Sequence, residues 1–233
     1  MANGRRVLIM AEMHGRDLVR RHAVLALLVA LPLAFYLSSD PTGQKGVTAG
    51  GVGMAFAIAG ATFFSTLSSA EVDQRLVLGG YRPIELLLGR LMFLGPLGLV
   101  IAVGFTVLMA AFSHPEEPWV LLLGVGAVAL ESIPLGLAVG AGIAQELEGT
   151  LVIIGIVGIQ MAANPDSMVA KVLPFHAPQA LITAGVEGQG AILLPLLWTV
   201  LYGVGLMVLA RIFLGSRLDV VAHRAGAPQP EDA

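Results

Sequence analysis

Long runs of apolar residues alternate with short polar stretches along the whole chain of 233 residues. A helix needs about 20 mostly apolar residues to cross the hydrocarbon core of a bilayer. The runs predict six membrane-spanning helices, at about residues 22–38, 46–70, 86–112, 119–143, 150–163 and 191–214, of which the fifth is short. The predicted fold class is therefore an all-α membrane protein, with a transmembrane domain over residues 22–214.

The stretch between the fifth and sixth runs is too polar to span a bilayer. Its residues 168–173 have a helical composition that Pro174 should stop, and Pro178 predicts a second break. Irregular backbone is not tolerated in contact with lipid, so this segment should lie against the protein. We expect a short external, re-entrant helical hairpin before the last span.

Residues 1–21 show the two-faced pattern of an amphipathic helix. The polar face holds Arg5, Glu12, Arg16 and Arg20, and the apolar face holds Val7, Ala11 and Leu18. A basic amphipathic helix of this kind can lie in the cytoplasmic interface of a membrane. The simpler alternative is an arginine-anchored lead-in to the first span. At the other end, the polar residues 215–233 predict a disordered cytoplasmic tail.

The positive charges predict which way the helices cross the membrane. With a cytoplasmic N-terminus, the inside segments hold all eleven arginines, whereas the outside loops hold only Lys45 and Lys171. Cytoplasmic segments of membrane proteins are enriched in Lys and Arg. Both termini are therefore expected in the cytoplasm, and the protein is expected to be a multi-pass protein of the plasma (inner) membrane.

Composition excludes several classes of protein. The chain is 56% hydrophobic and 12% charged, against roughly 25% charged residues in soluble domains. It has no cysteine, so it can form neither disulfides nor thiolate metal sites. Its few basic residues are spread thinly, which argues against a nucleic-acid partner.

Candidate catalytic chemistry is sparse. A phosphate-binding loop needs Gly-Lys followed by Ser or Thr, but Gly46 follows Lys45 and Val172 follows Lys171. The five histidines lie in separate segments, and no serine has a Gly-x-Ser-x-Gly setting. We therefore predict no catalytic residue, no metal site and no cofactor of its own, and the protein is not expected to be an enzyme.

Glu131 stands out because it lies near the middle of the fourth span, beside Ser132 and close to Pro134. An ionisable group at this depth is costly and normally faces a protein interior or a cavity. One hypothesis gives it a role with substrate or in proton transfer. The alternative is a protonated or hydrogen-bonded carboxyl that satisfies the backbone carbonyl freed by Pro134 and holds the broken helix together.

Glycines recur at four-residue spacing, as in Gly46 and Gly50 or Gly136 and Gly140. Small residues at this spacing let membrane helices approach closely. The pattern is compatible with tight packing inside one bundle or with a seam between two subunits.

The cytoplasmic segment 71–85 combines an acidic start, a basic and leucine-rich turn, two glycines and a proline. These signals predict a short helix lying across the membrane, ended by Gly79 and Gly80 and restarted at Pro83. Exposed Leu76, Leu78 and Tyr81 among arginines would suit docking onto another protein. A merely capped, positively charged loop is the alternative.

The run GGYRPIELLLGRL, with the charged and leucine-rich turn before it, resembles the cytoplasmic loop of type-two ABC exporter permeases. Asp73-Gln74-Arg75 stands where the strong form of that family has a Gly-Thr pair. The amphipathic start, the six spans and the broken hairpin VLPFHAP are also similar. The resemblance implies that this loop is a coupling helix fitting a cleft on an ATP-binding subunit. The residues implied in coupling are Asp73, Arg75, Leu76, Leu78, Gly79, Gly80, Tyr81 and Arg82.

The same resemblance implies a permease subunit that pairs with a second permease subunit, identical or different, within membrane lipid. ATP would be bound and hydrolysed on the separate ATPase subunit. A haem-export permease of cytochrome maturation remains an alternative because it has a similar size and layout. A stand-alone channel or secondary transporter is another, although such a carrier should place more polar residues in mid-membrane than Glu131.

Overall fold

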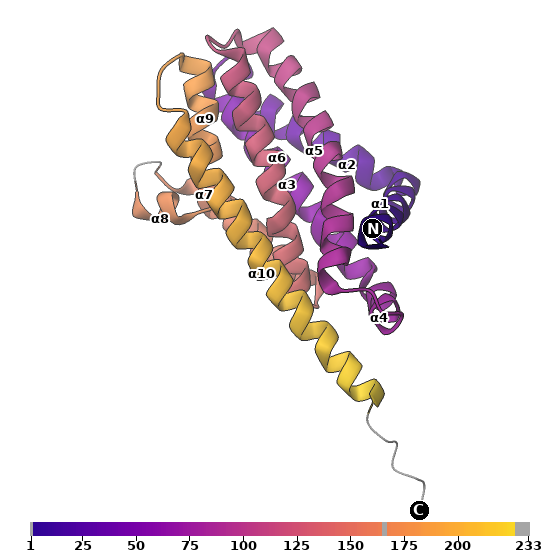
Figure 1. The fold of residues 1–233 in the computed structure, drawn as a ribbon. Coiled ribbons are helices and arrows are strands. Elements are labelled where there is room, and N and C mark those ends of the chain that lie inside the picture. The colour runs from indigo at the N-terminus through magenta and orange to yellow at the C-terminus, as the bar shows by residue number, and fades with distance from the viewer. Residues whose placement is uncertain (1, 165–166, 227–233) are drawn as a thin grey trace, which may run out of the picture.

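The computed structural model describes residues 2–164 and 167–226, and all regular structure within these residues is helical (Figure 1). The helices are α1 (Ala2–Arg20), α2 (His22–Ser38), α3 (Gln44–Ser68), α4 (Ala70–Leu78), α5 (Pro83–Ser113), α6 (Pro118–Gly142), α7 (Glu146–Ala162), α8 (Met168–Val172), α9 (His176–Glu187) and α10 (Leu193–Gly226). The predicted all-α class is therefore confirmed.

Four of these helices, α3, α5, α6 and α10, are long and apolar enough to cross a membrane. The predicted spans at 22–38 and 150–163 correspond to α2 and α7, which have 17 residues each. That is a little short of the about 20 residues that a straight crossing needs. The chain is thus a helical membrane protein, and six crossings remain a prediction.

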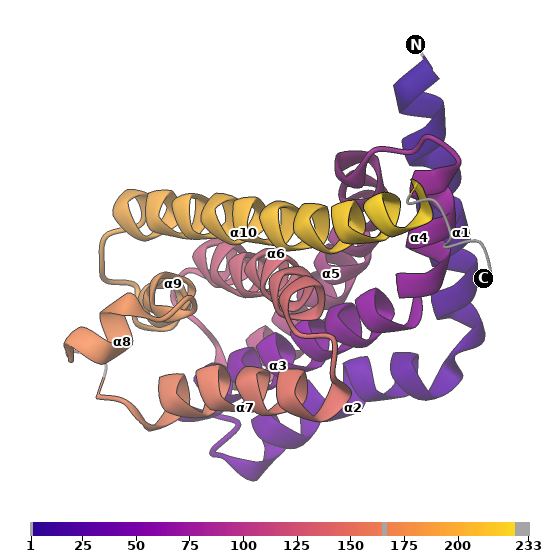
Figure 2. The same ribbon diagram turned by 90° about the horizontal axis from the view of Figure 1, so that it is seen from below.

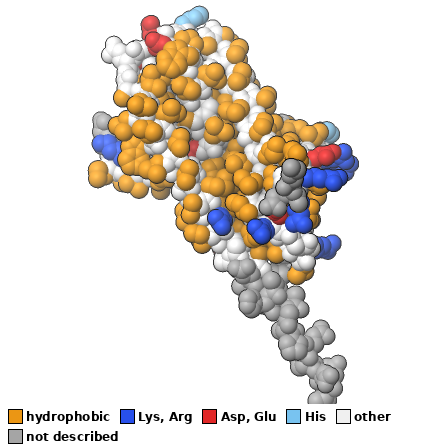
Figure 3. All heavy atoms as spheres, viewed as in Figure 1, with side chains coloured by type: hydrophobic (Ala, Val, Ile, Leu, Met, Phe, Trp, Pro, Cys, Tyr) orange, Lys and Arg blue, Asp and Glu red, His pale blue; other side chains and the backbone are white. Residues whose placement is uncertain are grey.

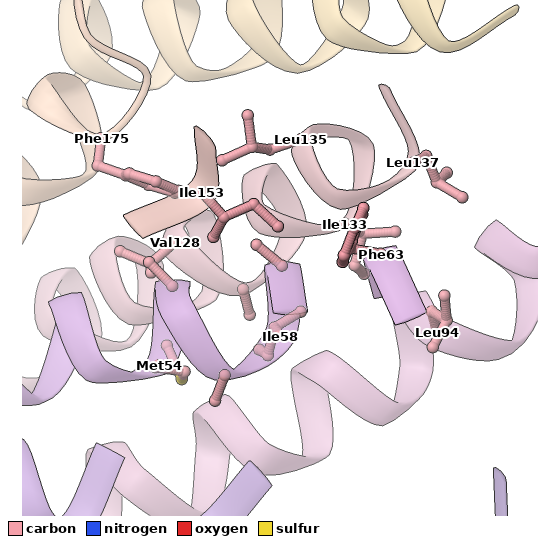
Figure 4. Packing of buried hydrophobic residues seen from close by; sticks show 14 of the residues in the cluster. Met54, Ile58, Phe63, Leu94, Val128, Ile133, Leu135, Leu137, Ile153 and Phe175 are labelled. Carbon is pink, nitrogen blue, oxygen red and sulfur yellow. The ribbon is translucent and has the colours of Figure 1, made fainter. Parts of the chain in front are cut away.

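Helix α6 forms the centre of the bundle, with α3, α5, α9 and α10 packed around it. Its side chains are buried along most of its length. Figure 4 shows Val128, Ile133 and Leu135 of α6 beside Ile58 of α3 and Ile153 of α7 in this core. Because α6 is apolar all round, it suits a position enclosed by other helices.

Glycines allow the close approach of α3 and α6. A Cβ atom at Gly136 would lie 2.4 Å from the carbonyl oxygen of Ala59, and one at Gly140 would lie 2.8 Å from Cβ of Thr66. A Cβ at Gly50 would lie 2.5 Å from the Cε atom of Met109. These glycines therefore face the interior of this chain, which confirms the interpretation of their spacing as packing within one bundle.

Helix α1 lies crosswise to the long helices at one end of the bundle (Figure 2) and packs against α5 and α2. Its polar face is exposed as predicted, but its buried face is centred on Met10 and His14. The predicted apolar positions Val7 and Ala11 are only half-buried, and the side chain of Leu18 lies outside the described set. The buried face is set by α5, where a Cβ at Gly89 would lie 2.6 Å from the Cβ of Met10.

The predicted break at Pro178 is wrong. Helix α8 ends before Pro174 as expected, but Pro178 is the third residue of α9. Proline fits there because the first amide groups of a helix have no partner within that helix. Helix α9 packs against α6 and α3, so this segment does lie against the protein. Its re-entrant path in a bilayer remains a prediction.

Helix α10 continues beyond the predicted end of the last span at residue 214 and reaches Gly226. Residues 215–226 are therefore helical where the sequence predicted the start of a disordered tail. After Gly215 no proline or glycine interrupts the helical pattern before Gly226, which explains the extension. The remainder of the predicted tail, residues 227–233, lies outside the described residues.

Candidate functional site

The segment 71–85 has the predicted local structure. Helix α4 ends at Leu78, and Gly80 follows with φ of 86°, a left-handed conformation that glycine adopts readily. Pro83 is the first residue of α5, where its missing amide proton is not needed. The side chain of Glu85 accepts a hydrogen bond from the amide of Arg82 at 2.9 Å, which caps α5.

A buried charge pair fixes α4 to α5. Nη2 of Arg90 lies 2.6 Å from Oδ2 of Asp73, and the two side chains are 0% and 2% exposed. Nη2 of Arg90 also donates a hydrogen bond to the hydroxyl of Ser69. Burial raises the pKa of the Asp73 carboxyl above its ordinary value, and the charge of Arg90 opposes that rise. From the sequence, Arg90 counted only as one more cytoplasmic positive charge, and Asp73 was expected at the docking surface rather than behind it.

His14 joins α1 to this pair. Nε of Arg90 lies 3.2 Å from Nε2 of His14, and Nδ1 of His14 lies 2.8 Å from the carbonyl oxygen of Met10. Since Arg90 can only donate and a carbonyl can only accept, these contacts assign the proton of the neutral imidazole to Nδ1. We name the set His14, Ser69, Asp73 and Arg90 the polar anchor. It joins α1 to the start of α4 and to α5, and His14 lies 76 positions from Arg90 in the sequence.

Arg6 holds the glycine turn that follows α4. Its Nη1 atom donates a hydrogen bond of 3.0 Å to the carbonyl of Gly80 and lies 3.8 Å from Oε2 of Glu85. Its guanidinium carbon lies 5.0 Å from the centre of the Tyr81 ring, within the range of a cation–π contact. Helix α1 therefore contacts the segment 71–85 directly, a relationship that sequence spacing could not reveal.

Part of the predicted exposed surface of the segment is instead turned inward. Leu76 and Tyr81 are half-buried and pack against the core, because α4 is pulled toward α5 and α1 by the anchor and by Arg6. Leu78 is exposed, as predicted, at 59%, and Val72 is exposed at 40%. We call Val72, Arg75 and Leu78, which lie on one face of α4, the outer face. Gly79 and Arg82 are exposed at its end.

The surface around α1 and α4 is basic. Figure 3 shows Lys and Arg side chains gathered near the end of the bundle that carries these helices, while hydrophobic side chains cover the body of the molecule. This separation matches what a membrane protein needs, because charged groups belong at the water-exposed end and apolar groups in lipid.

Glu131 lies in a different part of the molecule, in α6. Its side chain is 1% exposed, and neither carboxyl oxygen has a hydrogen-bond partner among the described residues. It therefore does not satisfy a carbonyl freed by Pro134, and α6 continues through that proline without a break. The alternative of a hydrogen-bonded carboxyl that holds a helix broken at Pro134 together is therefore wrong. Instead, Glu131 lines a groove between α5, α6 and α10.

Within residues 2–164 and 167–226, no three His, Asp or Glu side chains come together in a way that could hold a metal ion. The candidate functional residues form two separate groups, the outer face with its polar anchor and the groove at Glu131. Comparison with protein-family models found no match for this chain, and comparison with curated proteins found none either.

Proposed function

We propose that this protein is the transmembrane permease subunit of an ATP-driven ABC transporter, an exporter, and that a separate ATP-binding subunit docks on α4. The observation that carries the proposal is the outer face of that helix. Two apolar side chains, Val72 and Leu78, are exposed beside Arg75 on a helix that lies outside the candidate spans. Exposed apolar side chains rimmed by charge are typical of protein-binding surfaces.

The contacts behind the outer face suit a helix that transmits force. The Asp73–Arg90 pair ties α4 to α5, and Arg6 ties the following turn to α1. A partner that pushes α4 would therefore move α5 with it, because the pair is buried and has short contacts. Movements of this kind shift membrane helices between two discrete arrangements in switching proteins.

The wider assembly follows from the same proposal. A second permease subunit, identical or different, would complete the pathway, with lipid around both. Both termini and α4 would lie in the cytoplasm, and the membrane would be the plasma (inner) membrane. The supporting observations are the basic surface near α1 and α4 and the eleven-to-two division of arginine and lysine.

The test is to purify the tagged protein from membranes of its native host in mild detergent and to measure ATP hydrolysis that co-elutes with it. We expect the wild-type protein to bring an ATP-binding subunit with it. The double variant Val72→Asp with Leu78→Asp should lose at least 90% of that activity, since interface energy is concentrated in a few apolar residues. Arg75→Ala should lose less, because a rim charge acts mainly on association rate and salt dependence.

The matched control is Leu147→Asp, which also introduces an aspartate at an exposed leucine outside the long spans. It should retain the co-eluting activity. Leu76 is unsuitable for substitution because it packs against the core, so its loss would confound docking with folding. If the Val72 and Leu78 double variant inserts normally and keeps its full ATPase activity, then α4 is not the docking site.

A further inference from the structure

A groove between α5, α6 and α10 is not explained by the proposed coupling role. Its volume is about 600 Å³, which is within the range of sites that bind small organic molecules. The residues that line it are almost all apolar, among them Leu99, Leu130 and Met207. The outer sides of α5 and α10 are largely exposed along their spanning segments, so the groove lies next to the lipid.

Two polar groups in the groove have no hydrogen-bond partner among the residues that the structure describes. Both carboxyl oxygens of Glu131 and the hydroxyl of Thr199 are buried without a hydrogen bond among the described residues. Both residues line the groove. Glu131 is 1% exposed and Thr199 is 8% exposed. Polar groups buried without partners are rare, because leaving them unpaired costs free energy that folding must supply elsewhere. A ligand that supplies a donor here would recover this cost.

We propose that the groove binds a lipophilic amine, with the apolar body of the ligand between α5, α6 and α10 and its ammonium group on the Glu131 carboxylate. The lining residues include one acidic side chain and no Lys or Arg, so the site favours a cation. The Thr199 hydroxyl offers a second acceptor for the ammonium protons. A lipid acyl chain would fill the apolar volume, but it would leave both polar groups unpaired.

Glycine at position 203 gives the groove part of its depth. Gly203 lines the groove, and a Cβ built there would meet no atom within 4 Å. A leucine at this position can therefore fill the groove without a clash against the protein. Gly158 of α7 offers a matched site, because it also has open space at its Cβ position but does not line the groove. The pair of substitutions separates loss of the groove from a general effect of adding leucine.

The experiment uses the full-length protein in nanodiscs, without ATP or a partner subunit, and radiolabelled dodecylamine as the probe. We expect saturable binding that unlabelled dodecylamine displaces and that dodecanol, of equal chain length, displaces at least tenfold less well. Glu131→Gln keeps the shape of the side chain but removes its charge, and should weaken binding at least tenfold. Gly203→Leu should also weaken it at least tenfold, whereas Gly158→Leu should leave it unchanged. Thr199→Val should weaken it less than Glu131→Gln.

Three results would overturn the inference. The first is equal binding of dodecylamine to the wild-type protein and to Glu131→Gln, and the second is displacement by dodecanol as effective as by dodecylamine. The third is occupation of the groove by a second copy of the chain. The wild-type protein would then be dimeric in detergent while Gly203→Leu would be monomeric, as size-exclusion chromatography with light scattering measures. Binding is measured on the isolated chain, so a failure to bind dodecylamine would leave the proposed ATPase coupling unaffected. Loss of the ATPase association would likewise leave the amine site unaffected.

Discussion

At the scale of single residues, the Asp73–Arg90 pair joins α4 to α5. Both side chains are almost completely buried and their charged atoms are 2.6 Å apart. A buried pair is not by itself evidence of high stability, because removing two charges from water is costly. Its value here is positional, since it fixes which side of α4 faces the protein and leaves Val72 and Leu78 outside.

This pair makes a prediction about stability. Asp73→Asn leaves the buried guanidinium of Arg90 without its charge partner and should destabilise the protein by about 3–5 kcal/mol. Replacing both residues with apolar ones, Asp73→Leu with Arg90→Met, should cost clearly less than the single change. Thermal unfolding in detergent is the measurement. As a control, Glu12→Gln breaks the exposed pair with Arg16 and should cost less than about 1 kcal/mol. If Asp73→Asn alone were as stable as the wild type, the inference that Arg90 needs the charge of Asp73 would be wrong.

At the scale of helices, α6 and α9 depend on two glycines where they cross. A Cβ at Gly124 would lie 2.7 Å from the backbone nitrogen of Ile182, and one at Gly185 would lie 2.4 Å from that of Leu121. In both cases the obstacle is backbone, which cannot rotate away as a side chain can. The close crossing positions α9, and with it the start of α10, against the centre of the bundle.

The glycine crossing gives the second stability prediction. Gly124→Ala and Gly185→Ala should each destabilise the protein by about 1–3 kcal/mol, because the added methyl group forces the two helices apart. Gly155→Ala is the matched control, because residue 155 lies in a helix and a Cβ atom there would have open space around it. It should be neutral or slightly stabilising, since alanine is the better helix former. The thermal unfolding midpoints of the three variants are measured in the same detergent. Equal midpoints would argue against a requirement for glycine where α6 and α9 cross.

At the scale of the whole molecule, the open question is how many helices cross the bilayer. Single cysteines can be introduced into this cysteine-free chain and labelled from outside intact cells with an impermeant maleimide. We expect Lys45→Cys and Lys171→Cys to be labelled, and Glu148→Cys to be labelled only after permeabilisation. Residue 148 lies in the first turn of α7 and residue 171 lies beyond its end, so labelling of both from the same side would show that α7 does not cross. Labelling at position 45 only after permeabilisation would reverse the predicted orientation.

Much of the fold could be predicted from the sequence, because the relevant signals are local. Apolar run length located α2 at the bounds that the structure has, and the glycines and Pro83 located the end of α4 and the start of α5. Contacts between distant segments could not be predicted. The inward side of Leu76 depends on Arg90 and α1, and the groove at Glu131 requires three helices to meet. Pro178 was misread because a proline signals a break or a helix start equally well.

The contact between Arg6 and Gly80 has a consequence for how the protein is made. Its two residues are 74 positions apart, and His14 and Arg90 are 76 apart. At about 5–20 residues per second, a ribosome needs roughly 4–15 s to synthesise that distance. During this interval α1 has emerged but its partners in the glycine turn and α5 do not yet exist. The exposed side chains of Leu8 and Ile9 give the nascent helix an apolar surface that can bind at the lipid headgroups during this time. Helix α1 would therefore adsorb to the membrane before it docks onto the glycine turn and α5. When α4 and its turn are synthesised later, α1 would already be in place at the membrane surface.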